Sequence, residues 1–349
     1  MSKHLFARVA AGFAFCAAAI SASAAPSYSG LFVFGDSLSD SGNNAIVLSA
    51  GGTQPLPQLN IPNDATYSRT PTDFGTYTNG AVWTQYLAQS LNLALAPSLA
   101  GGNNYAFAGA QTSVNGDDLP QLPGFPYSMR TQVNTYLGTL GSNASADPNA
   151  LYIVAGGGNN VRVLLDAVTP STTPEQFAAL AGATVTAYAA DMAGMVADLK
   201  QAGAQHILVL NTPNLGLTPF ANSTGLGVQA SALSAAMNTA LFSLIGNAPG
   251  VSTFDMYSFL TEAVTASQAG ATGFSNWTNA CAADGATNPC DTSLFWDGIH
   301  PTTLGHQQLA AAVMANALPV PEPETYAMLA VGLAVIALSR RRRATVQQR

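Results

Sequence analysis

Four short apolar segments alternate with longer stretches of helical periodicity, and this alternation restricts the fold more than any other feature of the sequence. The apolar segments are rich in β-branched and aromatic residues and span residues 31–34, 151–155, 206–210 and 251–254. Helices are expected over residues 82–93, 129–140, 174–201, 226–245 and 303–317. Strands separated by helices need crossover connections, so the sequence predicts an α/β fold with a mainly parallel sheet and helices on both faces.

Polar segments follow the first two predicted strands. Residues 35–44 read GDSLSDSGNN and residues 156–160 read GGGNN. In parallel sheets ligands bind at the carboxyl ends of the strands, so we expect the chemistry in these two segments. Residues 49–80 are rich in Gly, Asn and Pro and are expected to form a long loop that lines a substrate cleft.

Ser37 stands in the turn between the first strand and the next helix. A serine there presents its hydroxyl outward, and the N–H groups of the helix N-terminus stabilise negative charge beside it. Helix capping is the alternative role for such a serine.

The segment DGIHP places Asp297 and His300 three residues apart, so that both can meet on one turn. The carboxylate then fixes the imidazole tautomer and the second ring nitrogen accepts a serine proton. Two other histidines, His206 and His306, follow the N-terminal segment of residues 1–24. His206 opens an apolar strand and His306 falls within the last helical pattern, so His300 is the expected base.

The segments 103–112 and 156–160 contain Gly and Asn residues, which supply backbone N–H and side-chain amide donors suited to an oxyanion. GGGNNV matches neither of the common phosphate-binding glycine motifs. GxSxG and HExxH are absent from the sequence, which disfavours the ordinary α/β-hydrolase and the zinc hydrolase.

Together the four ordered segments resemble the GDSL, or SGNH, family of esterases and lipases from about residue 31 to 317. The resemblance implies a three-layer α/β/α, flavodoxin-like domain. It also implies Ser37 as the nucleophile, His300 as the base and Asp297 as its orienting partner. The oxyanion would be held by the backbone N–H groups of Ser37 and Gly109 and by the amide of Asn159. No metal or organic cofactor is implied.

Two positions depart from the family's usual pattern. Ala108 precedes Gly109 where two glycines are common, and Asn160 follows Asn159 where an aspartate is usual. The expected function is hydrolysis of a small-molecule or lipid ester through a Ser37 acyl-enzyme. Two alternatives stay open: an acyltransferase that uses the same acyl-enzyme, and a non-catalytic surface or matrix binding protein.

Both ends of the chain read as export signals. Residues 1–24 have the basic, apolar and small-residue order of a signal peptide, with a lipid anchor on Cys16 as the lesser alternative. Residues 319–349 contain VPEPE, a short apolar run and an arginine cluster, which resemble the PEP-CTERM sorting signal of Gram-negative bacteria. That resemblance implies transient membrane association, processing by an exosortase and a cell-surface, matrix or secreted destination. The expected hydrolase domain is therefore residues 25–318.

Two cysteines remain between these signals. Cys281 and Cys290 lie nine residues apart in the sequence, and in an exported protein they are expected to form a disulfide. The bond would either hold the segment that delivers Asp297 and His300 or stabilise the fold in general.

Charge is scarce and unevenly distributed. Only 8% of the 349 residues are charged, against roughly 25% in an average protein. Residues 25–318 hold sixteen acidic and four basic side chains, a net charge of −12. Nucleic acids and anionic membranes are therefore disfavoured as partners. Aromatic residues in the loops suggest an apolar acyl or aromatic binding site; they are Tyr67, Phe74, Tyr77, Phe125 and Tyr127.

Overall fold

The computed structural model describes residues 27–141, 144–246, 248–271 and 273–318. Residues 28–318 form one compact unit. The predicted signal peptide with Cys16 and the predicted sorting segment lie outside the described residues.

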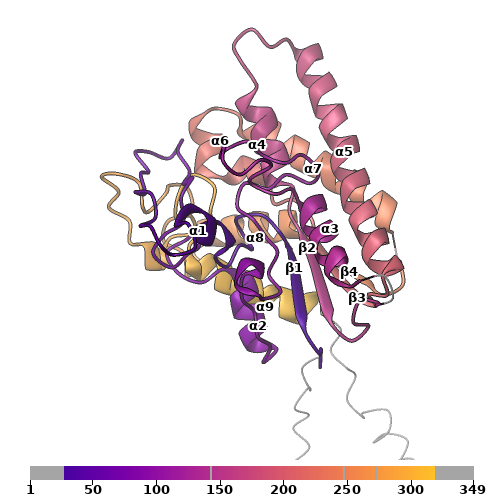
Figure 1. Cartoon of the computed structure of the whole chain (residues 1–349). Helices are drawn as coiled ribbons and strands as arrows, with labels where there is room; N and C mark the ends of the chain where they lie inside the picture. The colour runs from indigo at the N-terminus through magenta and orange to yellow at the C-terminus, as the bar shows by residue number, and fades with distance from the viewer. Residues whose placement is uncertain (1–26, 142–143, 247, 272, 319–349) are drawn as a thin grey trace, which may run out of the picture. The chain divides into compact units, whose positions relative to one another are not determined.

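A parallel sheet of four strands forms the centre of the fold (Figure 1). The strands are β1 (Leu31–Gly35), β2 (Leu151–Ala155), β3 (His206–Leu210) and β4 (Val251–Phe254), hydrogen-bonded in the order β1-β2-β3-β4. The α/β prediction is confirmed, and the apolar runs end within one residue of the observed strands. β1, β2 and β3 are buried along most of their length, and strands of this kind read as continuous apolar runs.

Residues 103–107 run along the outer edge of β1, which the sequence did not predict. Val33 N donates to Asn103 O over 3.1 Å, and Tyr105 N donates to Val33 O over 2.8 Å. Phe107 N donates in turn to Gly35 O over 3.3 Å. With this segment counted second in chain order, the sheet has the 2-1-3-4-5 order of flavodoxin-like folds.

Five helices lie close to their predicted ranges: α2 (Trp83–Ser90), α3 (Met129–Thr139), α5 (Pro174–Gln201), α7 (Gly227–Ile245) and α9 (Thr303–Asn316). Four others were missed: α1 (Asn43–Leu48), α4 (Gly158–Asp166), α6 (Pro219–Ser223) and α8 (Met256–Gln268). Residues 49–82 contain neither helix nor strand, which confirms the loop predicted over residues 49–80.

Alternating strand residues bury against opposite helical layers. Phe34, Tyr152 and Val209 belong to the apolar cluster that includes α3, α4, α5 and α7. Val33 and Ile153 belong to the cluster that includes α2 and α9. Because side chains alternate along a strand, one sheet can serve two cores, and the result is the predicted three-layer arrangement.

α5 and α7 are long and apolar enough to cross a membrane by length and composition alone. Their buried residues, among them Met192 of α5 and Met237 of α7, lie in the same cluster as the sheet. One or two helices of this length and composition are weak evidence for a membrane span.

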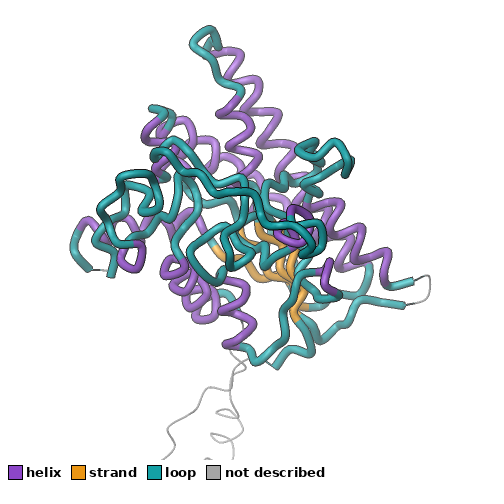
Figure 2. Tube along the Cα trace, turned by 60° about the vertical axis from the view of Figure 1, so that its left-hand side comes forward, coloured by secondary structure: helices purple, strands orange, loops and turns teal. Residues whose placement is uncertain are grey.

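Loops make up much of the trace, whereas the strands form a small central patch (Figure 2). Loops therefore surround the polar segments that follow β1 and β2. The candidate site lies in this region.

Candidate active site

The turn after β1 holds Ser37 in a fixed position. Ser39 N and Asp40 N both donate to Asp36 O, over 3.0 and 2.9 Å, which closes the turn. On the strand side, the side chain of Gln132 in α3 makes two hydrogen bonds to the backbone of Gly35. Its Oε1 accepts from Gly35 N and its Nε2 donates to Gly35 O, each over 2.9 Å. The turn therefore cannot shift along the strand without breaking two buried hydrogen bonds.

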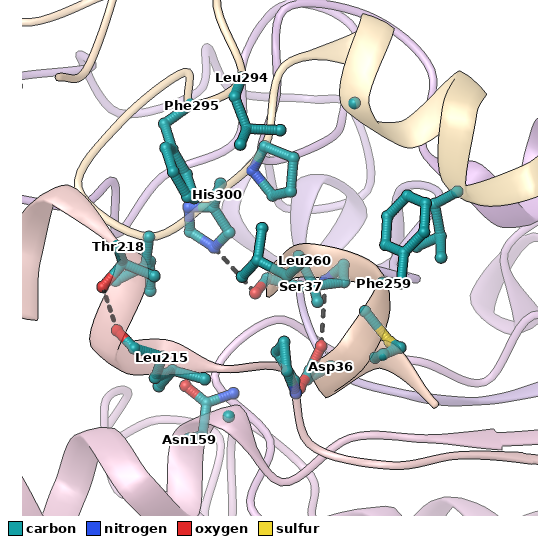
Figure 3. Close-up of a pocket in the computed structure, with 18 residues that line it drawn as sticks. Asp36, Ser37, Asn159, Leu215, Thr218, Phe259, Leu260, Leu294, Phe295 and His300 are labelled. Atoms are coloured by element: carbon teal, nitrogen blue, oxygen red, sulfur yellow. Dashed lines mark hydrogen bonds between the residues drawn. The ribbon is translucent and has the colours of Figure 1, made fainter. Parts of the chain in front are cut away.

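Ser37, His300 and Asp297 form a hydrogen-bonded chain. His300 Nε2 lies 2.8 Å from Ser37 Oγ, and His300 Nδ1 lies 2.7 Å from Asp297 Oδ2. The serine–histidine contact is drawn as a dashed line in Figure 3. The side chains come from two turns separated by 263 positions in the sequence, and all three are buried.

Asp297 accepts more hydrogen bonds than the sequence suggested. Its Oδ1 accepts from Ile299 N and His300 N, over 2.9 and 2.7 Å, which closes its own turn. Its Oδ2 also accepts from Ser68 N over 2.7 Å. The backbone of the 49–82 loop thus helps to orient the carboxylate, a contact that no spacing rule could reveal because Ser68 lies 229 positions away.

Asn159 lines the same cleft as Ser37, Gly109 and His300. Its Nδ2 donates to Ala110 O over 3.0 Å and its Oδ1 accepts from Arg162 Nε over 3.1 Å. An amide nitrogen has two N–H groups, so one remains for a ligand.

Gly109 lies at a backbone φ of +86°, a region that residues with a Cβ rarely adopt. The loop that carries it is tied to the serine turn by Asp40, whose Oδ2 accepts from Ala108 N and Asn44 N, each over 3.2 Å. The backbone of Ala108, which replaces the family's usual glycine, therefore takes part in this tie.

Asp40 is fully buried beneath these loops. Burial raises the pKa of the Asp40 carboxyl to about 6, although four backbone N–H groups favour its charged form. Burial likewise raises the pKa of Asp36 to about 6, against the opposing effects of a hydrogen bond from Leu38 N and the nearby His300.

Asn160, which stands in the place of the family's usual aspartate, pairs with Thr112. Its Oδ1 accepts from Thr112 N over 3.2 Å, and its Nδ2 donates to Thr112 Oγ1 over 3.0 Å. The threonine hydroxyl donates in turn to Asp191 Oδ2 over 2.8 Å. The Asn160 amide oxygen thus accepts a backbone N–H, as a carboxylate oxygen in its place would. The Asn160 amide nitrogen donates to the Thr112 hydroxyl oxygen, whose own proton is donated to Asp191.

The other two described histidines lie away from Ser37. His206 packs edge-on against Tyr28, with ring centroids 5.5 Å apart. His306 is buried and its Nδ1 accepts from Trp83 N over 3.2 Å, which leaves its Nε2 without a partner among the described residues. Burial lowers the pKa of His306 to about 3.

The disulfide between Cys281 and Cys290 adjoins the segment that leads to Asp297. Cys281 N donates to Phe295 O over 3.1 Å, and Ala282 N donates to Trp296 O over 2.9 Å. This loop therefore contacts the two residues that directly precede Asp297.

Two cavities meet at Ser37. The larger, of about 750 Å³, is a cleft of mixed polarity bordered by the 49–82 loop and the 108–126 segment. The smaller, of about 70 Å³, is almost entirely apolar. Figure 3 shows Phe259, Leu260, Leu294 and Phe295 around it, beside Ser37 and His300.

The loop aromatics divide into two groups. Tyr67, Tyr77 and Phe125 line the larger cleft. Phe74 is 66% exposed and lines neither cavity, and Tyr127 packs against Phe107 with ring centroids 5.1 Å apart. Arg162, which the sequence reasoning missed, lies over the Tyr67 ring at 5.2 Å.

Comparison with known proteins gives two matches to family descriptions. Residues 31–313 match the GDSL-like Lipase/Acylhydrolase family. Residues 319–343 match the PEP-CTERM protein-sorting motif, which indicates export in Gram-negative bacteria.

Individual relatives include a Pseudomonas putida protein described as "Uncharacterized protein in trpE-trpG intergenic region", 32% identical over 82% of this chain and 48% of its own length. Lipase 1 of Photorhabdus luminescens is 31% identical over 56% of this chain and 24% of its own length. This chain thus spans about half of the first relative and a quarter of the second.

Among solved structures, the lipase Lip_vut3 from a goat rumen metagenome aligns with a TM-score of 0.41 and 15% identity, over 82% of this chain and 95% of that one. The match over residues 31–313 covers most of the sequence, and the predicted family is confirmed. The chain belongs to the GDSL-like lipase/acylhydrolase family.

Proposed function

We propose that this protein is an exported serine esterase that hydrolyses carboxylic esters through an acyl-enzyme on Ser37. The observation that carries the proposal is the chain from Ser37 Oγ to His300 Nε2 (2.8 Å) and from His300 Nδ1 to Asp297 Oδ2 (2.7 Å). Such a chain, beside a cleft, suits nucleophilic catalysis at a carbonyl carbon. Membership of a lipase and acylhydrolase family agrees with this chemistry.

The reaction proceeds in two halves. His300 Nε2 takes the Ser37 proton as Oγ bonds to the ester carbonyl carbon, and the imidazolium then gives that proton to the departing alcohol as the ester C–O bond breaks. In the second half, His300 takes a proton from water, and the resulting oxygen nucleophile attacks the acyl carbon. The bond from carbon to Ser37 Oγ breaks, Oγ regains a proton, and the acid leaves. Asp297 stabilises the imidazolium in both halves.

The oxyanion of each tetrahedral intermediate is held by Ser37 N, Gly109 N and Asn159 Nδ2. Support for this set comes from the common cleft of the three residues and from the single Asn159 N–H that protein groups leave unused. Arg162 acts as a positioning residue. Its Nε donates a hydrogen bond to Asn159 Oδ1, which fixes the amide with its oxygen toward Arg162.

Export would use both ends of the chain. We propose that residues 1–24 are removed as a signal peptide and that an exosortase processes residues 319–349 after transient anchoring in the inner membrane. The hydrolase domain, residues 25–318, would then act at the cell surface, in the extracellular matrix or after secretion. The match of residues 319–343 to a sorting motif supports this route.

Hydrolysis of p-nitrophenyl acetate tests the proposal. His300→Ala should lose nearly all activity, by at least about a thousandfold, because the base is removed. His306→Ala, a matched histidine change outside the site, should keep most activity per folded molecule. The reverse pattern would assign the base to His306, and full activity in both variants would contradict the mechanism.

A further inference from the structure

The two cavities that share Ser37 differ in polarity and size. The small cavity is lined mainly by apolar side chains, whereas polar and apolar side chains both line the larger cleft. Ser37, Asn159, Ile299 and His300 border both, so an ester carbonyl at Ser37 would have one substituent in each space.

Building on the proposed esterase function, we infer that the substrate is the ester of a short aliphatic acid with a neutral alcohol rich in hydroxyl groups. The acyl chain enters the small apolar cavity and the alcohol occupies the larger cleft. Each half of this assignment rests on its own set of contacts.

The small cavity suits a short chain of methylene groups. Met256, Phe259 and Leu260 of α8 form one wall, and Leu294 and Phe295 form another. A polyol placed here would lose its hydrogen bonds to water without replacement, whereas an alkyl chain would lose none. Its volume of about 70 Å³ is roughly half that of the ~150 Å³ apolar cavity known to hold benzene, so about three or four carbons fit beyond the carbonyl.

The larger cleft offers polar groups that are free to bind hydroxyls. The side chains of Gln111, Asp117 and Asp118 line it and make no hydrogen bond to any described residue. Asn115 and Arg69 add further polar atoms on the same walls. Amide and carboxylate oxygens accept hydrogen bonds, and amide and guanidinium nitrogens donate them, so the cleft matches groups that do both, as a hydroxyl does.

The charges of the cleft favour a neutral ligand. Two positive and two negative side chains line the cleft: Arg69, Arg162, Asp117 and Asp118. Arg162 is already paired with Asp166 over 2.9 Å. The net charge of −12 over residues 25–318 repels anions as a whole, which disfavours phosphorylated alcohols.

A long-chain glyceride fits poorly by the same reasoning. Of the two spaces bordered by Ser37, only the small one is predominantly apolar, and it is too short for a chain of eight or more carbons. The further chains of such a lipid would lie against the carboxylates of Asp117 and Asp118.

The acyl half is tested with p-nitrophenyl esters from acetate to decanoate on the full chain. We expect kcat/KM to rise roughly threefold to fourfold for each methylene up to butyrate, because each buried methylene contributes a similar hydrophobic free energy to binding of the transition state. From octanoate onward we expect values at least about tenfold below that of butyrate, since the chain no longer fits the cavity.

Two variants change the cavity in opposite directions. Leu260→Phe fills it and should lower the ratio of butyrate to acetate hydrolysis about tenfold, whereas Phe259→Ala enlarges it and should raise hexanoate relative to butyrate. Leu244→Phe is the matched control, because Leu244 is 59% exposed on α7 and should leave the profile unchanged.

The alcohol half is tested with 6-O-acetylglucose, which keeps the free hydroxyl groups of the sugar, against p-nitrophenyl acetate. Gln111→Leu should lower kcat/KM for the sugar ester about tenfold more than for the aryl ester, because only the sugar can use the lost amide. Gln89→Leu, on the exposed face of α2, is the control and should change neither.

Three results would overturn the inference. A kcat/KM that climbs through octanoate and decanoate would contradict the short acyl chain, as would an unchanged butyrate-to-acetate ratio in Leu260→Phe. Equal losses on both acetates in Gln111→Leu would contradict the hydroxyl-rich alcohol. In each of these cases ester hydrolysis itself persists, so the proposed function survives. Absence of hydrolysis for every ester would overturn both together.

Discussion

Arg162 fixes the orientation of the Asn159 amide: its Nε donates a hydrogen bond of 3.1 Å to Asn159 Oδ1. The guanidinium is itself held by Tyr67 OH at 2.8 Å and by Asp166 Oδ2 at 2.9 Å. It is one of four cationic side chains in residues 25–318, and it is almost fully buried. A scarce positive charge is thus placed next to the residue proposed to bind the oxyanion.

Asn159→Ala should reduce kcat for p-nitrophenyl acetate about 100-fold to 1000-fold, with a smaller effect on KM. The reason is that the lost amide donor acts mainly on the charge that develops in the transition state. Steady-state kinetics measure the split between kcat and KM. A variant with kcat within about threefold of the parent would remove Asn159 from the oxyanion set.

Arg162→Lys should lower kcat about tenfold with KM within about twofold. Lysine keeps the charge but lacks the planar fork that bonds Asn159, Tyr67 and Asp166 together. In the Asn159→Ala background the same change should cost nothing further, because it acts through Asn159.

Arg130→Lys is the matched control, since Arg130 pairs with Asp198 and borders neither cavity. If the falls in kcat caused by Arg162→Lys and Asn159→Ala multiply in the double variant, Arg162 has a role independent of the Asn159 amide.

Asn160→Asp, which restores the family's usual residue, should destabilise this chain by about 1 kcal/mol. Thr112 Oγ1 has one proton and already gives it to Asp191, so a second carboxylate at position 160 would find no donor there. Urea unfolding measures the change in the free energy of unfolding. Adding Asp191→Asn should restore most of the loss, and an additive second loss would contradict this account.

His306 should make the folded state less stable as the pH drops below about 6.5. Burial lowers the pKa of His306 to about 3, so between pH 6.5 and 3 the unfolded chain binds a proton that the folded chain does not. Asp36 and Asp40 act in the opposite sense: their pKa values near 6 favour the folded state at low pH, and this contribution is lost as the pH rises from 4 to 6.

His306→Asn separates these contributions, because asparagine keeps an acceptor for Trp83 N but does not titrate. The difference in unfolding free energy between pH 7 and pH 4.5, measured in urea, should become smaller by on the order of 2 kcal/mol. The same difference in the variant and the parent would show that His306 does not govern acid stability.

The sheet could be predicted from the sequence because buried parallel strands read as continuous apolar runs. The segment 103–107 at the edge of β1 was not predicted, because it is joined to β1 by only a few hydrogen bonds. It also carries Asn103 and Asn104, which interrupt any apolar pattern. α8 left a signal that could have been used: Asp255 caps its first turn, and Met256, Leu260 and Val264 are buried at intervals of four.

The candidate site was predictable where its residues stand in short motifs, as Asp297 and His300 do. Ser68 and Arg162 were not predictable in this way. Ser68 contributes a backbone N–H, which no residue type encodes, and Arg162 reaches Tyr67 across 95 positions of sequence. Such long-range contacts are fixed by the packing of loops, and a single sequence does not display that packing.

Covalent labelling with a fluorophosphonate probe, followed by peptide mass spectrometry, tests the central claim most directly. An activated serine should carry the phosphonate on the peptide that contains Ser37. Ser37→Ala should abolish the label. Ser39→Ala should keep it, because Ser39 is fully buried and its Oγ accepts a hydrogen bond from Trp83 Nε1 over 3.1 Å. An unlabelled folded protein, or a label that persists in Ser37→Ala, would contradict the proposal that this chain is a serine esterase acting through Ser37.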